Sequence, residues 1–529
     1  LYTFSQHVHV TENEGQSWDI ISPDLTRNDP EKLKSSGGPI TQDNTSVEYY
    51  CTIFAANESP LKEGLLWVGS DDGLINVTQD GGKTWTDVTP KGMPEWMMIN
   101  SIEPSAFEEG TCYVAGTKYK TGDFSPYLYK TTNYGKNWTK ITNGINPEHF
   151  TRVLREDPKR KGLLYAGTET GMYISFNDGK DWKPFQLNLP IVPITDLTIK
   201  DNNLIVATQG RSLWMIDDLS VIHQLYDADL SKSVLFKPKN TYRMRGGSRT
   251  GSKTNGTNHP NGVITYFNLK EFKEDDKVSL TFFDTKGDTI KKFSSKDKEN
   301  KLTVKKGSNQ FVWDMTYDGA ERLEGMILWW ASLEGPRAIP GAYKVNLRIE
   351  DSVTLSKVEM SQPFTILADP RAESTLADMK KQFIFVKDVN KTMDDAHKSI
   401  KKIRAVNKQL NAFQKQYAAD DNVKELVEKA TVLEEQLSNI EKELYQTKNR
   451  SGQDPLNFPI KLTNKLGHLN SLVSMGDFAP TEQDIAVKNE LSGKIKKQLD
   501  AFNTILNDEV KAFNLAFNAK QLNYLFVED

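Results

Sequence analysis

The chain has 529 residues, 26% of them charged, and its formal net charge at pH 7 is −4. This is the composition of an ordinary soluble protein, with no overall attraction to nucleic acid or to an anionic membrane. No apolar run approaches the ~20 residues of a membrane helix, and the length suffices for about three domains.

One eight-residue pattern, Ser/Thr-x-Asn/Asp-x-Gly-x-x-Trp, dominates the N-terminal part of the chain. It occurs four times, at residues 11–18, 78–85, 131–138 and 175–182. Each copy follows a short apolar run, as expected for a hairpin turn between two strands. The third residue can hydrogen-bond the amides of its own turn, and the glycine supplies a positive φ. The tryptophan buries a large surface, best used where neighbouring repeats pack together.

The third position of this pattern decides between a catalytic and a structural interpretation. A catalytic or metal-binding role would need a carboxylate there, but three of the four copies carry an amide. They are Asn13, Asn133 and Asn177, against Asp80 alone. An amide braces a turn but cannot act as a general base, so we interpret the motif as scaffold.

Residues 1–228 read as antiparallel strand sets of a β-propeller, about five blades in this chain. The stretch 65–74 is repeated at 163–172, and 204–214 starts a fifth unit that lacks the motif. Leu1 already opens a strand, so we expect the chain to be the C-terminal part of a larger propeller, whose remaining blades would be a partner. The longest insertion, 22–59, contains Glu48; it is either a binding loop or an ordered spacer.

Three further segments follow in chain order. Residues 229–262 are predicted to be a linker, because the composition from about residue 242 to 262 shifts to Gly, Ser, Thr and Asn. Residues 263–368 alternate as strands and predict an immunoglobulin-like β-sandwich. Residues 369–529 change to a helical period, with capping patterns at Thr375 and Thr481. They predict an antiparallel helical bundle, with a partner-binding coiled coil as the alternative.

The repeated pattern resembles the Asp-box (BNR) repeats of sialidases, of xyloglucanase-type propellers and of the sortilin or VPS10 propeller. The fuller sequence resembles a set of bacterial BNR-repeat proteins usually labelled glycosyl hydrolase or sortilin-like. The best-matching segments are 37–41, 64–73, 126–132, 155–162, 210–218 and 334–343. The resemblance implies a propeller, an immunoglobulin-like sandwich and a helical tail, preceded by further blades. The hydrolase label rests on scaffold repeats and conveys little about chemistry.

A hydrolase would need carboxylates in the propeller. Asp71, Asp72 and Glu169 follow the presumed inner strands and could face a central channel as a glycosidase pair; otherwise they satisfy turns. Arg152 and Arg211, together with Arg155, could converge on a ligand, although salt bridging at the surface is the commoner fate of such arginines. The arginine-bearing first-blade motif of sialidases is absent.

No cofactor or metal is predicted. His7 and His9 share one face of a strand, but the sequence offers no third ligand. Cys51 and Cys112, the only cysteines, have neither a paired nor a metal-type spacing, so the redox compartment stays open. No phosphate loop, nucleophile elbow or basic-aromatic stripe appears, which argues against nucleic acid.

We therefore expect a non-catalytic binding or scaffold protein of the bacterial periplasm, cell surface or exterior. Its propeller would bind a peptide, protein or glycan, with Asp71, Asp72, Glu169, Arg152, Arg211 and Glu48 as the candidate ligand-binding residues. One alternative is a glycoside hydrolase that uses Asp71, Asp72 or Glu169. Another is a subunit of a larger surface or secretion complex.

Overall fold

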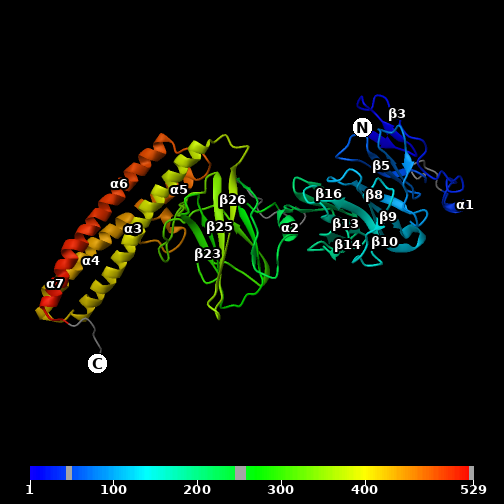
Figure 1. The fold of residues 1–529 in the computed structure, drawn as a ribbon. Helices are drawn as coiled ribbons and strands as arrows, with labels where there is room; N and C mark the ends of the chain where they lie inside the picture. The colour runs from blue at the N-terminus through cyan, green and yellow to red at the C-terminus, as the bar shows by residue number, and fades with distance from the viewer. Residues whose placement is uncertain (43–49, 245–255, 257, 523–529) are drawn as a thin grey trace. The chain divides into compact units, whose positions relative to one another are not determined.

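The computed structural model describes residues 1–42, 50–244, 256 and 258–522. The chain forms two compact units, Leu1–Ala228 and Asp229–Asp529 (Figure 1). The first unit is built almost entirely of small antiparallel sheets, and the second combines sheets with long helices. The expected fold class, mainly β with a helical C-terminal region, is confirmed.

The first unit contains five sheets among its described residues, each made of strands that follow one another in sequence. Three short strands form the first sheet: β1 Tyr2–Phe4, β2 Val8–Val10 and β3 Asp19–Ile20. The second comprises β4 Ile53–Glu58, β5 Leu66–Ser70, β6 Ile75–Thr78 and β7 Thr86–Asp87. The third comprises β8 Met98–Pro104, β9 Cys112–Lys118, β10 Asp123–Thr131 and β11 Thr139–Lys140.

The fourth sheet comprises β12 Thr151–Glu156, β13 Leu164–Thr168, β14 Gly171–Ser175 and β15 Lys183–Pro184. The fifth comprises β16 Ile194–Lys200, β17 Asn203–Thr208 and β18 Leu213–Ile216. Short helices complete the unit: α1 Gly38–Thr41, the 3-10 turn η1 Tyr119–Thr121 and α2 Ser220–Leu225.

The sheets are arranged as propeller blades. The first strands pack against one another in turn, β4 on β8, β8 on β12 and β12 on β16, and therefore form the inner layer. Middle strands such as β5 and β13 are buried along their whole length, because neighbouring blades cover both of their faces. Trp67 and Tyr165 are fully buried there.

The motif turns have the geometry that the sequence predicts. In the third copy, Thr131 Oγ1 accepts the amide of Gly135 at 3.0 Å, and Asn133 Oδ1 accepts the amide of Asn137 at 3.0 Å. Gly135 has φ of +80°, and an added Cβ would meet the Val88 Cβ at 2.4 Å. Only glycine therefore lets this turn lie against the preceding blade.

The motif tryptophans join neighbouring blades. The indole N–H groups of Trp85, Trp138 and Trp182 donate to backbone carbonyls of the preceding repeat, over 2.9, 2.6 and 2.7 Å. The Trp182 side chain is buried, whereas Trp18 in the first copy is 39% exposed. Three of the four tryptophans thus lie between repeats as predicted.

The second unit begins with a two-sheet sandwich. One sheet has the order β19 Val234–Leu235, β21 Val263–Leu269, β24 Gly307–Trp313. The other has the order β20 Thr241–Arg243, β26 Lys357–Ala368, β25 Gly341–Glu350, β22 Lys277–Phe283, β23 Thr289–Ser294. Between the sheets, the rings of Phe282 and Trp313 stack at 4.5 Å.

The segment 229–262, predicted as a linker, contributes to the sandwich. Strand β19 pairs with β21, and β20 runs parallel to β26. Leu235 and Arg243 are buried in these two strands. Both strands are too short for alternation to be recognised, and the Gly- and Ser-rich stretch that predicted a linker follows β20 in the sequence. Arg245 and Arg249, two basic residues of that stretch, lie outside the described residues.

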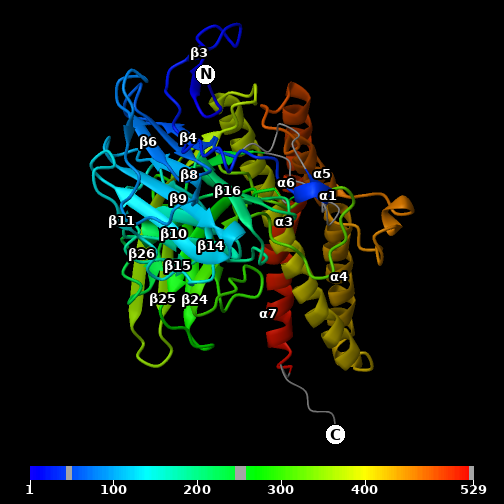
Figure 2. The ribbon, with the colours of Figure 1, turned by 90° about the vertical axis from the view of Figure 1, so that its right-hand side faces the viewer.

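Long helices form the rest of the second unit (Figure 2). They are α3 Leu376–Gln416, α4 Lys424–Leu444, α5 Leu462–Val473, α6 Glu482–Thr504 and α7 Lys511–Ala519. A π-helical segment, η4 Ile505–Val510, joins α6 to α7, and the 3-10 turns η2 Asp421–Val423 and η3 Asp454–Leu456 lie in the connections. Both predicted capping boxes, at Thr375 and Thr481, are present. Among the described residues, no helix is both long and apolar enough to cross a membrane.

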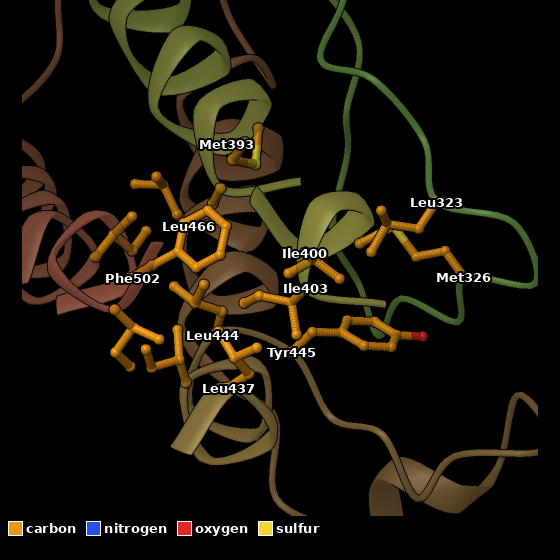
Figure 3. Packing of buried hydrophobic residues seen from close by; sticks show 14 of the residues in the cluster. Leu323, Met326, Met393, Ile400, Ile403, Leu437, Leu444, Tyr445, Leu466 and Phe502 are labelled. Atoms are coloured by element: carbon orange, nitrogen blue, oxygen red, sulfur yellow. The ribbon is translucent and has the colours of Figure 1, made fainter. Parts of the chain in front are cut away.

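A loop of the sandwich joins the core of the helical region, while the sandwich has a core of its own between its two sheets. Leu323 and Met326, from the loop after β24, pack beside Ile403 and Tyr445 of the helical region (Figure 3). The Tyr445 hydroxyl accepts the amide of Ile327 at 2.9 Å. This loop therefore binds the sandwich to the bundle by both apolar and polar contacts.

Candidate functional site

The blades have two different ends. Because the strands of a blade are antiparallel, successive connections alternate between its ends. The motif turn is the third connection and lies beside the first, as the bond from the Gly81 amide to the Gly64 carbonyl shows (3.0 Å). The second connection lies at the opposite end, where the Glu169 amide bonds the Phe150 carbonyl (3.1 Å). We call this the second-turn end; Asp71, Asp72 and Arg211 belong to it as well.

Asp72 braces the long insertion against its blade. It is fully buried, and its carboxylate accepts the Ser70 hydroxyl at 2.5 Å and the Arg27 amide at 2.7 Å. The Arg27 guanidinium returns a bond to the Asp72 carbonyl at 2.9 Å. Asp71 accepts the amide of Thr52 at 2.9 Å. Burial is the main cause that raises the pKa of Asp71 above its ordinary value.

Arg152 and Glu169 form the ion pair at the second-turn end of the fourth blade. Arg152 Nε and Nη2 both lie 2.7 Å from Glu169 Oε2. The guanidinium also lies over two aromatic rings, 5.4 Å from the centre of Tyr119 and 5.2 Å from that of Phe150. Those rings stack at 4.8 Å. Phe124 lies 6.1 Å from Phe150 and is 52% exposed.

These five residues, Tyr119, Phe124, Phe150, Arg152 and Glu169, are called the aromatic–arginine cluster below. The sequence identified its two charged members but missed its aromatic ones. Tyr119 and Phe124 come from the connection between β9 and β10 and the start of β10. Strand β10 has nine residues, against four in β6 and five in β14, and the insertion between Thr117 and Tyr127 was the signal available in the sequence.

A cavity of about 630 Å³ lies next to the cluster, and both apolar side chains, such as Ile145 and Met172, and uncharged polar ones line it. His149 and Thr170, the chain neighbours of Phe150 and Glu169, contribute to its wall. The Tyr173 hydroxyl bonds His149 Nδ1 at 2.8 Å. A concave site with a partly apolar wall, a few polar groups and an exposed aromatic side chain in the neighbouring cluster is suited to bind a ligand.

The remaining candidates do not join this site. Arg211 is exposed, and its guanidinium donates to the Gly210 carbonyl at 2.8 Å without an ion pair among the described residues. Glu48 lies outside the described residues. The blade β8–β11 lies between the sheets that carry Asp71 and Glu169, and no described contact joins those carboxylates.

A second group of charges lies on the inner strands; its arginine, Arg155, was named from the sequence, but the acidic partners were not. Arg155 on β12 bonds Asp196 of β16 at 2.8 Å and the Ser101 hydroxyl of β8 at 2.6 Å. Glu103 lies 3.7 Å from the same guanidinium. Burial raises the pKa of Glu103 to about 7, although Arg155 opposes the shift. Arg152 and Arg155 are three residues apart on β12 but have different partners. Arg152 pairs with Glu169, and Arg155 pairs with Asp196.

The two N-terminal histidines have structural partners. His9 Nε2 bonds the Ser5 hydroxyl at 2.9 Å, and His7 Nδ1 bonds the Ser22 carbonyl at 3.2 Å. In the part of the chain that the structure describes, no three His, Cys, Asp or Glu side chains are grouped to hold a metal.

No protein-family model matches the sequence. A stretch of 108 residues is 25% identical to the oligoxyloglucan-reducing end-specific xyloglucanase of Emericella nidulans, covering 20% of this chain and 13% of the relative. Among solved structures, the GH74 xyloglucanase from Xanthomonas campestris aligns over 68% of this chain and 62% of its own, at 13% identity and a TM-score of 0.33.

A structure titled YCF48 bound to D1 peptide aligns over 31% of this chain and 51% of its own, at 19% identity and a TM-score of 0.25. The chain thus spans 13% of the curated relative and between half and two thirds of these two structures. None of the three bears a sortilin or BNR name, so that resemblance stays an expectation from the sequence.

Proposed function

We propose that residues 1–228 form a non-catalytic binding unit that takes a peptide, protein or glycan at the second-turn end of its blades. The observation that carries this proposal is the aromatic–arginine cluster beside the 630 Å³ cavity. Aromatic rings supply contact area at low entropic cost, and the polar groups of the wall supply orientation. A protein of this kind fits the bacterial envelope or exterior, where such ligands are met.

The bonding partners of the charged groups at the second-turn end support binding rather than catalysis. Glu169 is paired with Arg152, and Asp72 is fully buried with donors on both oxygens. A glycosidase needs one carboxyl to donate a proton and a second to act on the sugar across the same cleft. Asp71 and Asp72 bond groups of their own blade and of the insertion, and Glu169 is paired with Arg152, so the bonding of all three carboxylates favours a binding role.

The test is a binding screen of the full chain on peptide and glycan arrays, followed by titration of the ligand found. Phe124→Ala and Arg152→Ala should each weaken binding at least tenfold, because they remove the rim and the cation that orders the rings. Phe54→Ala is the matched control, since Phe54 is 54% exposed but lies on the inner strand β4. Binding that is lost in Phe54→Ala and kept in Phe124→Ala would contradict the proposal.

A glycoside hydrolase is the second candidate, and the inner charges favour it over the turn carboxylates. Glu103, with a pKa of about 7, is a carboxyl that can hold a proton at neutral pH, as a general acid must. Asp196 is 63% exposed at its side chain and shares Arg155 with Glu103. This candidate predicts release of reducing sugar from xyloglucan oligosaccharides, lost in Glu103→Gln and Asp196→Asn. Turnover that is kept in Glu103→Gln and Asp196→Asn but lost in Glu169→Gln would assign the activity to the carboxylates of the second turns instead.

A further inference from the structure

A groove on the helical part of the second unit has no role in the function proposed above. It lies between α4 and the segment formed by η4 and α7 and has a volume of about 500 Å³. Glu425, Glu428 and Val432 line it from α4, and Glu509, Ala512 and Phe513 line it from the other side. We call it the acidic groove.

The spacing shows that two helix faces form this groove. Glu425, Glu428 and Val432 are three and four residues apart and therefore lie on one face of α4. Glu509 and Phe513 are four apart, across the junction of η4 and α7. The groove therefore runs along both helical segments, and from Glu425 to Val432 it spans about 10 Å, or two helical turns.

The charge of the groove is one-sided. Three carboxylates and one ammonium, that of Lys429, line it. All four side chains belong to exposed residues, and none makes an ion pair within the described part of the chain. On the other helices, surface acids such as Asp394 and Glu490 pair with lysines four residues on. The acidic groove thus holds an excess of unneutralised negative charge.

Between these charges the groove is apolar. Val432 is 53% exposed, while Leu433 and Phe513 are buried at its base. A second cavity, of about 350 Å³, lies on the α3 side and shares Leu433 and Phe513 with the groove. Phe513 therefore borders both hollows, while its ring packs against that of Phe413 at 5.4 Å.

The helix itself is irregular at this place. The π-helical segment Ile505–Val510 interrupts the run from α6 to α7, and Glu509 lies within it. π-Helical turns are rare and occur frequently at functional sites. Since an uninterrupted α-helix would rotate Glu509 and Phe513 relative to α6, the π-helical segment sets the face that these residues present to α4.

We propose that the acidic groove binds a basic amphipathic helix of a partner protein. The partner's apolar residues, three and four positions apart over two turns, cover Val432 and Phe513. Its flanking lysines or arginines meet Glu425, Glu428 and Glu509, so the charges are complementary. This inference is independent of the propeller ligand, because the groove belongs entirely to the second unit.

The test uses two synthetic 14-residue helical peptides with the same leucine face, one carrying lysines and one carrying glutamates on its polar face. Titration of each labelled peptide with the full chain should show binding of the lysine peptide alone, weakening as salt is raised. Glu425→Lys/Glu428→Lys should reduce its affinity at least tenfold, and Val432→Asn should also reduce it. Glu299→Lys in the sandwich makes a charge reversal outside the groove and should leave affinity unchanged.

Several outcomes would overturn the proposal. The first is absence of binding by the lysine peptide, and the second is equal binding of both peptides. The third is a loss of affinity in Glu299→Lys as large as that in Glu425→Lys/Glu428→Lys. Circular dichroism of each variant confirms that the helices persist, as expected for exposed positions. Sedimentation of the chain without peptide measures its oligomeric state. Dimers that dissociate in Glu425→Lys/Glu428→Lys would assign the groove to a second copy of this chain instead.

Discussion

At the residue scale, each of the four motif copies has one side-chain oxygen that accepts the same hydrogen bond within its turn. The third side chain accepts the amide four residues on, at 3.0 Å in Asn13, 2.9 Å in Asp80, 3.0 Å in Asn133 and 2.9 Å in Asn177. The extra charge of Asp80 is not needed for this bond. The Thr84 hydroxyl and amide lower the pKa of Asp80 to about 2, so it is ionised at neutral pH.

Asp80→Asn should therefore leave the melting temperature and ligand binding of the chain unchanged. An asparagine keeps the acceptor oxygen, and its amide can donate to the Thr84 hydroxyl as that of Asn13 does to Ser17 (2.9 Å). Asp80→Ala, the control, removes the acceptor and should lower the melting temperature. Differential scanning calorimetry measures both; a loss of stability in Asp80→Asn equal to that in Asp80→Ala would show that the charge matters.

A buried histidine should make the second unit sensitive to acid. His397 is fully buried, with Nδ1 at 2.6 Å from the Glu321 carbonyl and no described partner for Nε2. Burial lowers its pKa from the ordinary value near 6.5. Below about pH 6.5 the unfolded chain takes up the proton first, so this group makes the folded state less stable as pH falls.

Urea unfolding of the wild type and His397→Gln between pH 7.5 and 5 measures this effect. The free energy of unfolding should fall more with acidification in the wild type than in His397→Gln. The half-buried His468, whose Nδ1 bonds the Trp330 carbonyl at 2.8 Å, supplies the control variant His468→Gln, which should keep the wild-type pH dependence. Parallel curves for wild type and His397→Gln would refute the assignment.

At the scale of elements, a buried ion pair connects the sandwich to the helices. Arg243 of β20 is 1% exposed, pairs with Asp477 and donates to the Ala338 carbonyl at 2.9 Å. Asp477 follows α5 and is 8% exposed. Removing one partner of such a pair leaves a buried charge without compensation.

Arg243→Leu should destabilise the second unit by about 3–5 kcal/mol, read from the urea midpoint followed by far-UV circular dichroism. In Arg243→Leu/Asp477→Leu neither charge remains buried, so the loss should be smaller than in the single variant. A double variant less stable than Arg243→Leu, or an unchanged midpoint in the single variant, would show that the pair does not hold the elements together.

The elements differ in how far the sequence could predict them. The motif turns and the two capping boxes depend on contacts within a few residues, so the pattern at Thr131 or Thr375 was enough. Strand β20 depends on pairing with β26, over a hundred residues away, and no local pattern carries that information. The aromatic members of the aromatic–arginine cluster were missed for the same reason, since the stacking of Tyr119 on Phe150 requires the propeller geometry.

The candidate site was predicted only in part. Arg152 and Glu169 were both identified, but their pairing follows from the register of β12 and β13, which the sequence does not specify. The sequence predicts Asp71 and Asp72 as possible channel residues. It does not predict their bonds to Thr52 and Arg27, because these bonds depend on how the insertion 22–59 folds. Their role in a ligand site stays a prediction.

At the scale of the whole molecule, the boundary at residue 228 separates two units, and the second combines the predicted sandwich and bundle. Beside the core contacts of Leu323 and Met326, the Ser332 amide bonds the Gly467 carbonyl at 3.0 Å. The sandwich loop is therefore part of the folded helical region.

The fragment 229–529 should consequently fold alone, with a cooperative melting transition that matches one transition of the full chain. The fragment 229–368, which keeps every strand of both sheets but lacks the helices, should aggregate or melt at lower temperature because it exposes Leu323 and Met326. Calorimetry of both fragments checks this. An equally stable 229–368 would show that the sandwich is independent of the bundle.

The central claim is that the repeated turn motif is scaffold and that ligands bind at the opposite end of the blades. The most direct measurement compares the affinity of one array-selected ligand for the wild type, Asp80→Asn and Phe124→Ala, each verified as folded. We predict unchanged affinity in Asp80→Asn and at least a tenfold loss in Phe124→Ala. Lost affinity in Asp80→Asn with wild-type affinity in Phe124→Ala would contradict the claim.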